Sequence, residues 1–186
     1  MFIQKYKTPS TFSDILMSSD GESLTGLWFE NSYDEIKHST NTELKNLEIF
    51  AETKRWLDIY FSGKIPDFVP KYKINNTTPF RQMVTDILND IPYGRVVTYK
   101  DIADEIAKKK NITKMSSQAV GGAVGHNPIC IIIPCHRVVG QNNNLVGYGG
   151  GIKNKIRLLE LEQNDINKFI IPKKGNKLWK DVNGVI

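Results

Sequence analysis

The stretch Ile129-Cys130-Ile131-Ile132-Ile133-Pro134-Cys135-His136-Arg137 joins an apolar run to three chemically active side chains. Five consecutive apolar residues between two prolines are typical of a buried strand. We therefore predict a strand over 129–133 that ends by presenting Cys135, His136 and Arg137, in a protein of mixed α/β (α+β) class. Adjacent side chains on a strand point to opposite sides, so we expect a bridging water between Cys135 and His136.

The pair Cys135 and His136 combines a potential nucleophile with a potential base. The thiolate is the reactive form, and a free cysteine has a pKa of about 8.5, so a base is needed near neutral pH. For an arbitrary Cys-His pair, a small buried thiol beside a core histidine is the commoner arrangement. The proline before this pair and the arginine after it favour a reactive thiol. Cys130 is assigned to packing.

The segments around the pair predict a loop and several short helices. Four glycines around Tyr148, over 147–151, allow a backbone to approach a ligand closely. A helix over 152–162 would bring Glu162 back toward the cysteine. Upstream, Thr98 caps one helix, and Ser116 or Ser117 caps a second helix of small residues over 118–124. Such a pair suggests a helix-turn-helix, although many helix pairs bind nothing.

The first half of the chain has a different pattern. Two apolar runs, 15–17 and 24–29, flank an Asp-Gly step and predict a β-hairpin. Thr40 and Glu43 form a capping-box pattern before an amphipathic helix that runs to Ser62-Gly63. Further elements are expected as a helix with Thr78 as N-cap that runs from Pro79 to about Asn89, and a short strand over 95–97.

The predicted boundary between the two halves lies near residue 75, because 64–78 holds two prolines, two adjacent asparagines and little periodicity. We expect domains over 1–75 and 76–163 and a basic tail over 164–186. The charge follows this division. Residues 1–75 carry 9 lysines and arginines against 11 acidic residues, whereas 76–186 carry 16 against 9. A polyanionic partner would bind the second half, although solvating surface lysines explain the charge alone equally well.

Composition excludes several protein classes. No apolar stretch approaches the roughly 20 residues that span a bilayer, and the first residues lack a signal-peptide pattern. Two cysteines five residues apart form no disulfide framework and no metal-ligand pairing with the three histidines. We expect a cytoplasmic protein without a membrane partner.

The segment 133–140, Ile-Pro-Cys-His-Arg-Val-Val-Gly, resembles the active-site motif of the O6-alkylguanine-DNA alkyltransferases, the methylated-DNA–protein-cysteine methyltransferases. The resemblance covers roughly 78–163, including Ala-Val-Gly-Gly-Ala over 119–123, Gly-His-Asn-Pro over 125–128 and the glycine loop. It is looser over the first half. It implies an N-terminal ribonuclease H-like α/β domain and a C-terminal winged-helix or helix-turn-helix-like domain. It also implies irreversible, single-turnover transfer of an alkyl group to Cys135 from guanine O6, with thymine O4 as a second candidate donor.

The resemblance also implies roles for individual residues. His136 would activate Cys135 through water, Glu162 would orient the histidine, and Asn127 would brace the turn. Tyr99 would help to rotate the target nucleotide and donate to guanine N3. The remaining implied residues are Tyr148, Gly149, Val124 and Lys155 at the base pocket, and Ser117, Gln118, Ala119, Gly121, Gly122 and Arg137 at the DNA. The base would leave the duplex, whose minor groove would receive the second helix.

Two departures from the family pattern carry predictions. Gln118 stands where relatives usually place an arginine that fills the gap left by the extruded nucleotide, so weaker or slower extrusion is expected. Residues 1–75 contain no cysteine and only His38, so the zinc site of some relatives should be absent, and no cofactor or metal is expected. A monomer is expected, because no dimerisation element is evident.

Three other functions remain as alternatives. A non-catalytic sensor of alkylguanine would bind the lesion and recruit other factors, but such relatives lack the cysteine. A thiol hydrolase or acyltransferase would leave the basic second half unexplained. A transcriptional regulator would leave the Cys-His-Arg segment unexplained.

Overall fold

The computed structural model describes residues 1–38 and 43–171. Its N-terminal half is a four-stranded sheet of order β3-β2-β1-β4, built from β1 (Phe2–Tyr6), β2 (Ile15–Ser19), β3 (Leu24–Phe29) and β4 (Glu43–Leu44). Strand β2 pairs antiparallel with β1 and β3, and β4 lies parallel to β1. The antiparallel pairing of β2 and β3 confirms the predicted hairpin. Its turn carries Gly21 at a φ of 115°, which favours glycine. Helix α1 (Tyr33–His38) follows β3.

Helix α2 (Glu48–Phe61) packs on the sheet, and its start differs from the prediction. Glu43 belongs to β4 rather than to a capping box, because pairing with Phe2 of β1 extends the backbone there. Leu47 is the N-cap of α2, without a side-chain cap. Thr40, the other half of the predicted box, lies outside the described residues. The apolar spacing matched the buried face only in part: of the residues on the predicted stripe Leu57 is buried, Leu47 and Phe61 are half-buried and Ala51 is exposed.

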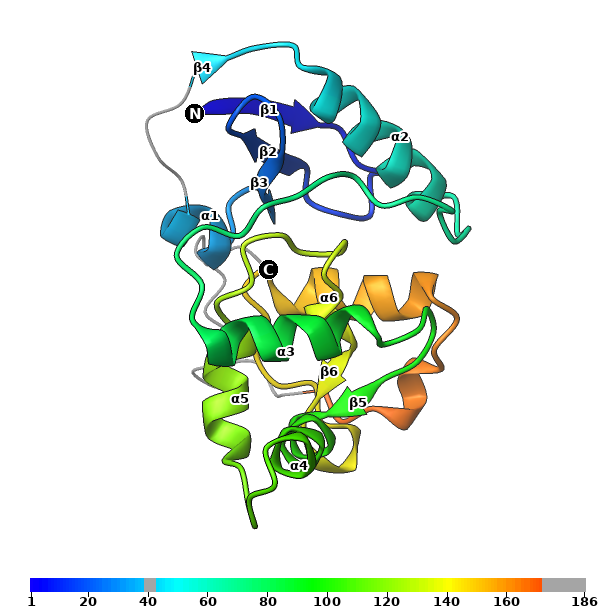
Figure 1. The fold of residues 1–186 in the computed structure, drawn as a ribbon. Helices are drawn as coiled ribbons and strands as arrows, with labels where there is room; N and C mark the ends of the chain where they lie inside the picture. Colours follow the sequence, from blue (N-terminus) through cyan, green and yellow to red (C-terminus); the bar gives the residue numbers. More distant parts are fainter. Residues whose placement is uncertain (39–42, 172–186) are drawn as a thin grey trace.

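The second half is mainly helical (Figure 1). Its helices are α3 (Pro79–Asn89), α4 (Tyr99–Lys109), α5 (Ser117–Val124) and α6 (Ile152–Leu161), with strands β5 (Val97–Thr98) and β6 (Val138–Val139) as a parallel pair. Thr78 caps α3, and Thr98 and Asp101 form the predicted capping box of α4. Ser116, rather than Ser117, caps α5. The strand expected over 95–97 is β5, which starts two residues later and ends one residue later than predicted.

The run over 129–133 is buried as predicted but is not a strand. Only Ile129 pairs with a strand, in a single bridge to Leu27 of β3. The chain then turns, with Ile132 N donating to Cys130 O and Ile131 at a φ of 67°. Cys135 therefore does not end a strand but begins the 3-10 helix η1 (Cys135–Arg137). Pro134, which has no N–H, could not have continued a ladder.

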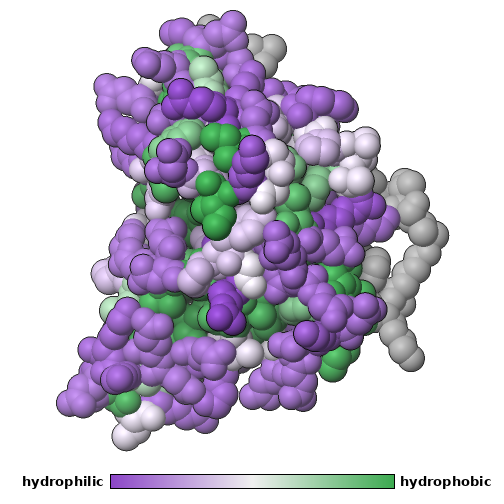
Figure 2. Space-filling model, turned by 90° about the vertical axis from the view of Figure 1, so that its right-hand side faces the viewer, coloured by the Kyte–Doolittle hydropathy of each residue, from purple (hydrophilic) through white to green (hydrophobic). Residues whose placement is uncertain are grey.

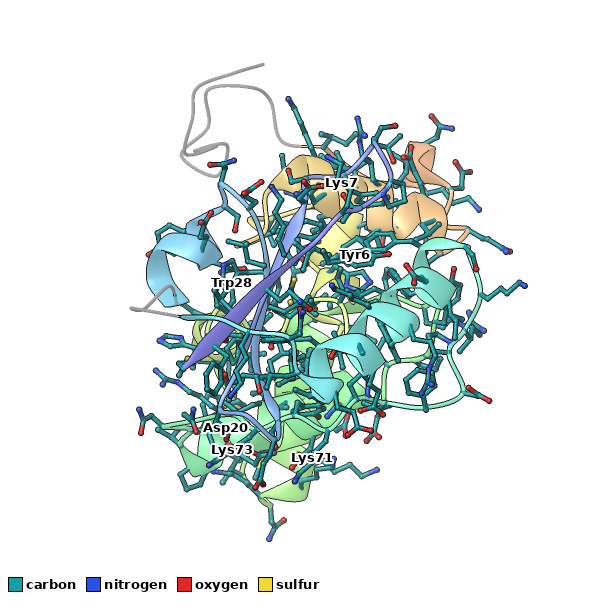
Figure 3. All side chains as sticks on the ribbon, turned by 90° about the horizontal axis from the view of Figure 1, so that it is seen from above. Tyr6, Lys7, Asp20, Trp28, Lys71 and Lys73 are labelled. Atoms are coloured by element: carbon teal, nitrogen blue, oxygen red, sulfur yellow. The ribbon has the colours of Figure 1, made fainter. Side chains whose placement is uncertain are left out.

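The free edge of β3 holds both the chain connection and the cysteine segment. Lys73 N donates to Leu24 O. Leu27 N donates to Pro128 O, and Cys130 N donates to Leu27 O. Beside the same sheet, Lys73 pairs with Asp20 and Lys71 lies nearby (Figure 3). The residues of the main buried core come from both halves. The sheet therefore positions the segment that leads to Cys135.

The remaining described chain packs on the second half. Two further 3-10 turns are η2 (Gln141–Asn143) and η3 (Ile166–Lys168), and Leu145 N donates to Ile170 O. A smaller core forms around Val139, Leu145, Ile152 and Leu159. Figure 2 shows one face of the molecule, covered largely by hydrophilic side chains with smaller apolar groups between them.

Candidate active site

Cys135 is held in a buried turn that Asn127 braces. The Asn127 Nδ2 donates to the Ile133 carbonyl at 2.9 Å and to Cys135 Sγ at 3.0 Å, and its Oδ1 accepts from Ile129 N at 3.0 Å. Asn127 lies directly after the turn that ends α5, so one amide fixes both sides of the cysteine loop. Only 8% of Cys135 is exposed. The thiol is thus fixed in position and shielded from bulk water.

A small cavity of about 70 Å³ opens beside the thiol. It brings together residues that are distant in the sequence, and its lining is Asp34, Tyr99, Gly121, Val124, Gly125, Asn127, Cys135, Gly147, Tyr148 and Gly149. Five of the predicted catalytic and pocket residues are therefore neighbours around Cys135. The cavity lies between the thiol and the glycine loop.

His136 and Glu162 form a buried pair behind the cysteine. The His136 Nε2 lies 2.8 Å from Glu162 Oε1, and both side chains are shielded from solvent. An ionised carboxylate only accepts hydrogen bonds, so Nε2 carries the proton and Nδ1 is left with a lone pair. That Nδ1 is buried and has no hydrogen-bond partner among the residues described. The His136 Nδ1 can therefore accept a proton. Within the described residues it forms no direct hydrogen bond to Cys135.

Three further groups that the sequence analysis did not assign to the relay converge on Glu162. The Tyr60 hydroxyl, from α2, donates to Oε1 at 2.7 Å, and Gly94 N donates to Oε2 at 3.1 Å. Arg137 donates from Nε at 2.9 Å to Oε2 and from Nη2 at 2.8 Å to Oε1. Its Nη1 donates to the Ile91 carbonyl. The assignment of Arg137 to DNA contact is therefore corrected, because its guanidinium is turned inward and binds Glu162.

Burial and charge set the protonation states of the relay. Burial opposes the Glu162 carboxylate, but the hydrogen bonds from His136 and Arg137 and the charge of Arg137 outweigh it and hold the pKa of Glu162 well below its usual value. Burial lowers the pKa of His136, so the imidazole is neutral near pH 7. Burial raises the pKa of Cys135 to about 11, opposed by the Asn127 hydrogen bond and the Lys155 charge. The resting state is a thiol beside a neutral histidine.

Lys155 is a buried cation that ties the glycine loop to the cysteine segment. Its Nζ donates to the Val138 carbonyl at 2.6 Å and to the Val146 carbonyl at 3.4 Å. Burial lowers its pKa to about 8. An ammonium between two backbone carbonyls, one on β6 and one before the loop, fixes the loop relative to Cys135.

The helix pair α4 and α5 lies at the end of the molecule away from the four-stranded sheet (Figure 1). Gln118, Ala119 and Gly122 are exposed on α5, whereas Ser117 and Gly121 are partly buried. A side chain added at Gly122 would meet nothing within 4 Å, so that face of α5 is open. Tyr99 begins α4 and lies against Gly121, and burial raises its pKa to about 12. The second helix can thus approach another surface closely.

Sequence reasoning missed Tyr60 and Asp34 because both come from the N-terminal half. They lie 76 and more residues from the relay in the chain, and no motif connects them to it. Of the described chain, no helix is long and apolar enough to cross a membrane. No group of three or more histidines, cysteines or acidic residues capable of holding a metal occurs over 1–38 and 43–171.

The fold and site define a class: proteins with a mixed α/β fold in which a buried cysteine, backed by a His-Glu pair, lies beside an exposed helix pair. Comparison with known families agrees. Residues 79–164 match the DNA binding domain of 6-O-methylguanine DNA methyltransferase, and residues 1–69 match the ribonuclease-like domain of the same proteins. The chain belongs to the 6-O-methylguanine DNA methyltransferase family.

Individual relatives support this membership. The chain is 37% identical over 158 residues to the methylated-DNA–protein-cysteine methyltransferase of Haemophilus influenzae, covering 83% of each. It is 39% identical over 153 residues to that of Methanosarcina acetivorans, covering 82% of this chain and 94% of the relative. A crystal structure of Mycobacterium tuberculosis OGT in complex with DNA superposes with a TM-score of 0.73, 31% identity and 98% coverage of both chains.

Proposed function

We propose that this protein repairs DNA by transferring an alkyl group, typically methyl, from O6 of guanine to Cys135. The observation that carries the proposal is the Cys135 thiol, which lies in a small cavity with Tyr99, Asn127 and Tyr148 and has the His136–Glu162 pair behind it. Family membership supports the same chemistry. The reaction uses no cofactor, because the protein itself accepts the alkyl group.

The relay explains how a thiol with a raised pKa can react. As Cys135 Sγ attacks the alkyl carbon, its proton passes to His136 Nδ1, with a bridging water as the expected link. The imidazolium is stabilised by the Glu162 carboxylate, which Arg137 and Tyr60 hold in place. The S–C bond forms, the O6–C bond breaks and the electron pair stays on the guanine. The guanine takes up one proton, which balances the proton lost by the thiol. It remains in the DNA as the normal base.

The product is a thioether, which the relay cannot hydrolyse, so each molecule acts once. Tyr99 would donate to guanine N3, and the backbone of Tyr148 and Gly149 would offer hydrogen bonds near O6; these residues line the cavity beside Cys135, which supports these roles. Val124 would cover the base, and Lys155 would hold the loop.

We further propose that the protein binds double-stranded DNA as a monomer and that α5 enters the minor groove. The exposed, unobstructed face at Gly122 and the small Ala119 beside it support close approach. The minor groove offers little base-specific readout, which suits a search for damage in any sequence. The protein would act in the reducing cytoplasm, where its two thiols stay free. The domain division near residue 75 remains a prediction.

The proposal is tested by incubating the protein with a duplex that holds one O6-methylguanine and measuring the protein mass. We expect a gain of one methyl on the peptide that contains Cys135, no second turnover, and no gain in Cys135→Ser. An unchanged mass with retained lesion binding would favour a non-catalytic sensor instead. Elemental analysis of the same sample should find no zinc, and a stoichiometric amount would contradict that expectation.

A further inference from the structure

Asp34 brings a carboxylate from the N-terminal half to the wall of the Cys135 cavity. It lies in α1, only 7% of it is exposed, and it lines the same cavity as Cys135. Its backbone N donates to the Gly149 carbonyl at 3.3 Å. An aspartate from the ribonuclease-like half therefore contacts the glycine loop at the point where the base should bind.

The contact between Asp34 and Gly149 is unusually close. A Cβ added at Gly149 would lie 2.0 Å from Asp34 Oδ1 and 2.3 Å from Oδ2, far inside any real contact. The carboxylate thus occupies the space of the missing side chain. Residue 149 can be only glycine while Asp34 stays in place, and the two residues together form one side of the pocket.

The Asp34 carboxylate also interacts electrostatically with the Cys135 thiol. The negative charge of Asp34 adds to burial in raising the pKa of Cys135, and it contributes to the raised pKa of Tyr148. Among the described residues, the other charged or titratable groups near the thiol include Lys155 from α6, Tyr99 from α4, Tyr148 from the glycine loop, Cys130 and the adjacent His136. Asp34 is the acidic member of that set, and it lines the cavity itself.

We propose that Asp34 is a specificity-determining residue of the alkyl-transfer site, forming a negatively charged wall that favours small, uncharged alkyl groups and rejects anionic ones. This inference rests on the proposed function. A like charge in a poorly solvated pocket is repelled strongly, because water screens little there. Discrimination by a repulsive element needs no added contact with the preferred substrate.

The test compares three duplexes that differ only in the group on guanine O6: methyl, carbamoylmethyl and carboxymethyl. Carbamoylmethyl and carboxymethyl have nearly the same size, and only the second is anionic. Single-turnover rates of mass gain on Cys135 are measured for the wild type, Asp34→Asn and Asp34→Ala. Asp14→Asn serves as control, since Asp14 pairs with Lys5 and Lys7 away from the cavity.

We expect the wild type and Asp14→Asn to transfer carbamoylmethyl about tenfold faster than carboxymethyl, as one like-charge repulsion would give. Asp34→Asn keeps the shape and should bring the two rates to within about twofold. Asp34→Ala should do the same and, in addition, raise the rate on O6-benzylguanine by widening the pocket. Equal wild-type rates on the two matched groups would overturn the inference, even if the Asp34 variants failed to fold.

A double-mutant cycle tests the contact itself. Gly149→Ala should slow methyl transfer because its Cβ meets the Asp34 carboxylate, and Asp34→Ala should restore part of the loss in the double variant. Losses that simply add would contradict the contact. The two proposals fail separately: a wild type that takes no methyl at all refutes the alkyl transfer, whereas methyl transfer with an unchanged charge ratio in Asp34→Asn refutes only the role of Asp34.

Discussion

The hydroxyl of Tyr60, on the helix of the N-terminal half, donates a 2.7 Å hydrogen bond to Oε1 of Glu162, the same oxygen that binds His136. The two residues are 102 positions apart in the chain. The ribonuclease-like half therefore takes part in the relay, in addition to holding the cysteine segment against β3.

Tyr60→Phe should slow methyl transfer about three- to tenfold, because one hydrogen bond to the charged carboxylate is lost while the ring packing remains. The free energy of unfolding should fall by about 1–2 kcal/mol. Single-turnover mass spectrometry and urea unfolding measure the two effects.

The control is Tyr93→Phe, whose hydroxyl donates to the Leu161 carbonyl rather than to the carboxylate. Tyr93→Phe should lose similar stability, but the pH at which transfer is half-maximal should shift only in Tyr60→Phe. Equal pH profiles for both variants and the wild type would show that Tyr60 is only a packing residue.

Glu162 should make stability depend on pH in the acid range. Its pKa in the folded protein lies below the unfolded value, so its contribution is fully present above about pH 4.3 and is lost as pH falls through the folded pKa. Glu162→Gln should cost about 3 kcal/mol at pH 7, because Arg137 is left without its carboxylate. Urea unfolding at a series of pH values should then show a flatter acid limb for the variant. An equally steep limb would mean that other carboxylates dominate acid unfolding.

Lys155→Met keeps the apolar stem and removes the ammonium. The cation lowers the pKa of the neighbouring Cys135 thiol, so its loss should raise that pKa further. The pH at which the rate of Cys135 alkylation by iodoacetamide is half-maximal should rise by about one unit. Methyl transfer should also slow, since the Val138 and Val146 carbonyls lose their shared donor.

Lys153→Met is the matched control, because Lys153 is exposed on the same helix. It should leave both the alkylation profile and the transfer rate unchanged. A shift of the same size in the control would assign the effect to surface charge.

Gln118→Arg should strengthen DNA binding and speed repair by about tenfold, because an arginine fills more of the gap and adds charge-assisted bonds. Gln118 is exposed near the start of α5, so the change should not disturb the core. Gln118→Lys separates charge from shape and should raise affinity without the same gain in rate. Affinity and rate that both remain unchanged in Gln118→Arg would refute the deficit predicted for glutamine.

The sequence by itself determined the local elements with strong end signals. Thr78, Thr98 and Ser116 each satisfy a free N–H at a helix start, so α3, α4 and α5 could be placed closely. It also determined the cysteine motif and the cavity neighbours in the second half, because that resemblance is continuous along the chain.

Only the tertiary structure decided the rest. Five apolar residues predict burial equally well in a strand or a turn, and contact with a single residue of β3 made 129–133 a turn. From the sequence alone, the Arg137 side chain could face either DNA or the interior. In the structure its guanidinium points inward, where it pairs with the buried carboxylate of Glu162. Tyr60 and Asp34 reach the site through packing between the halves. Such long-range contacts depend on how the elements assemble, and local residue patterns do not encode that arrangement directly.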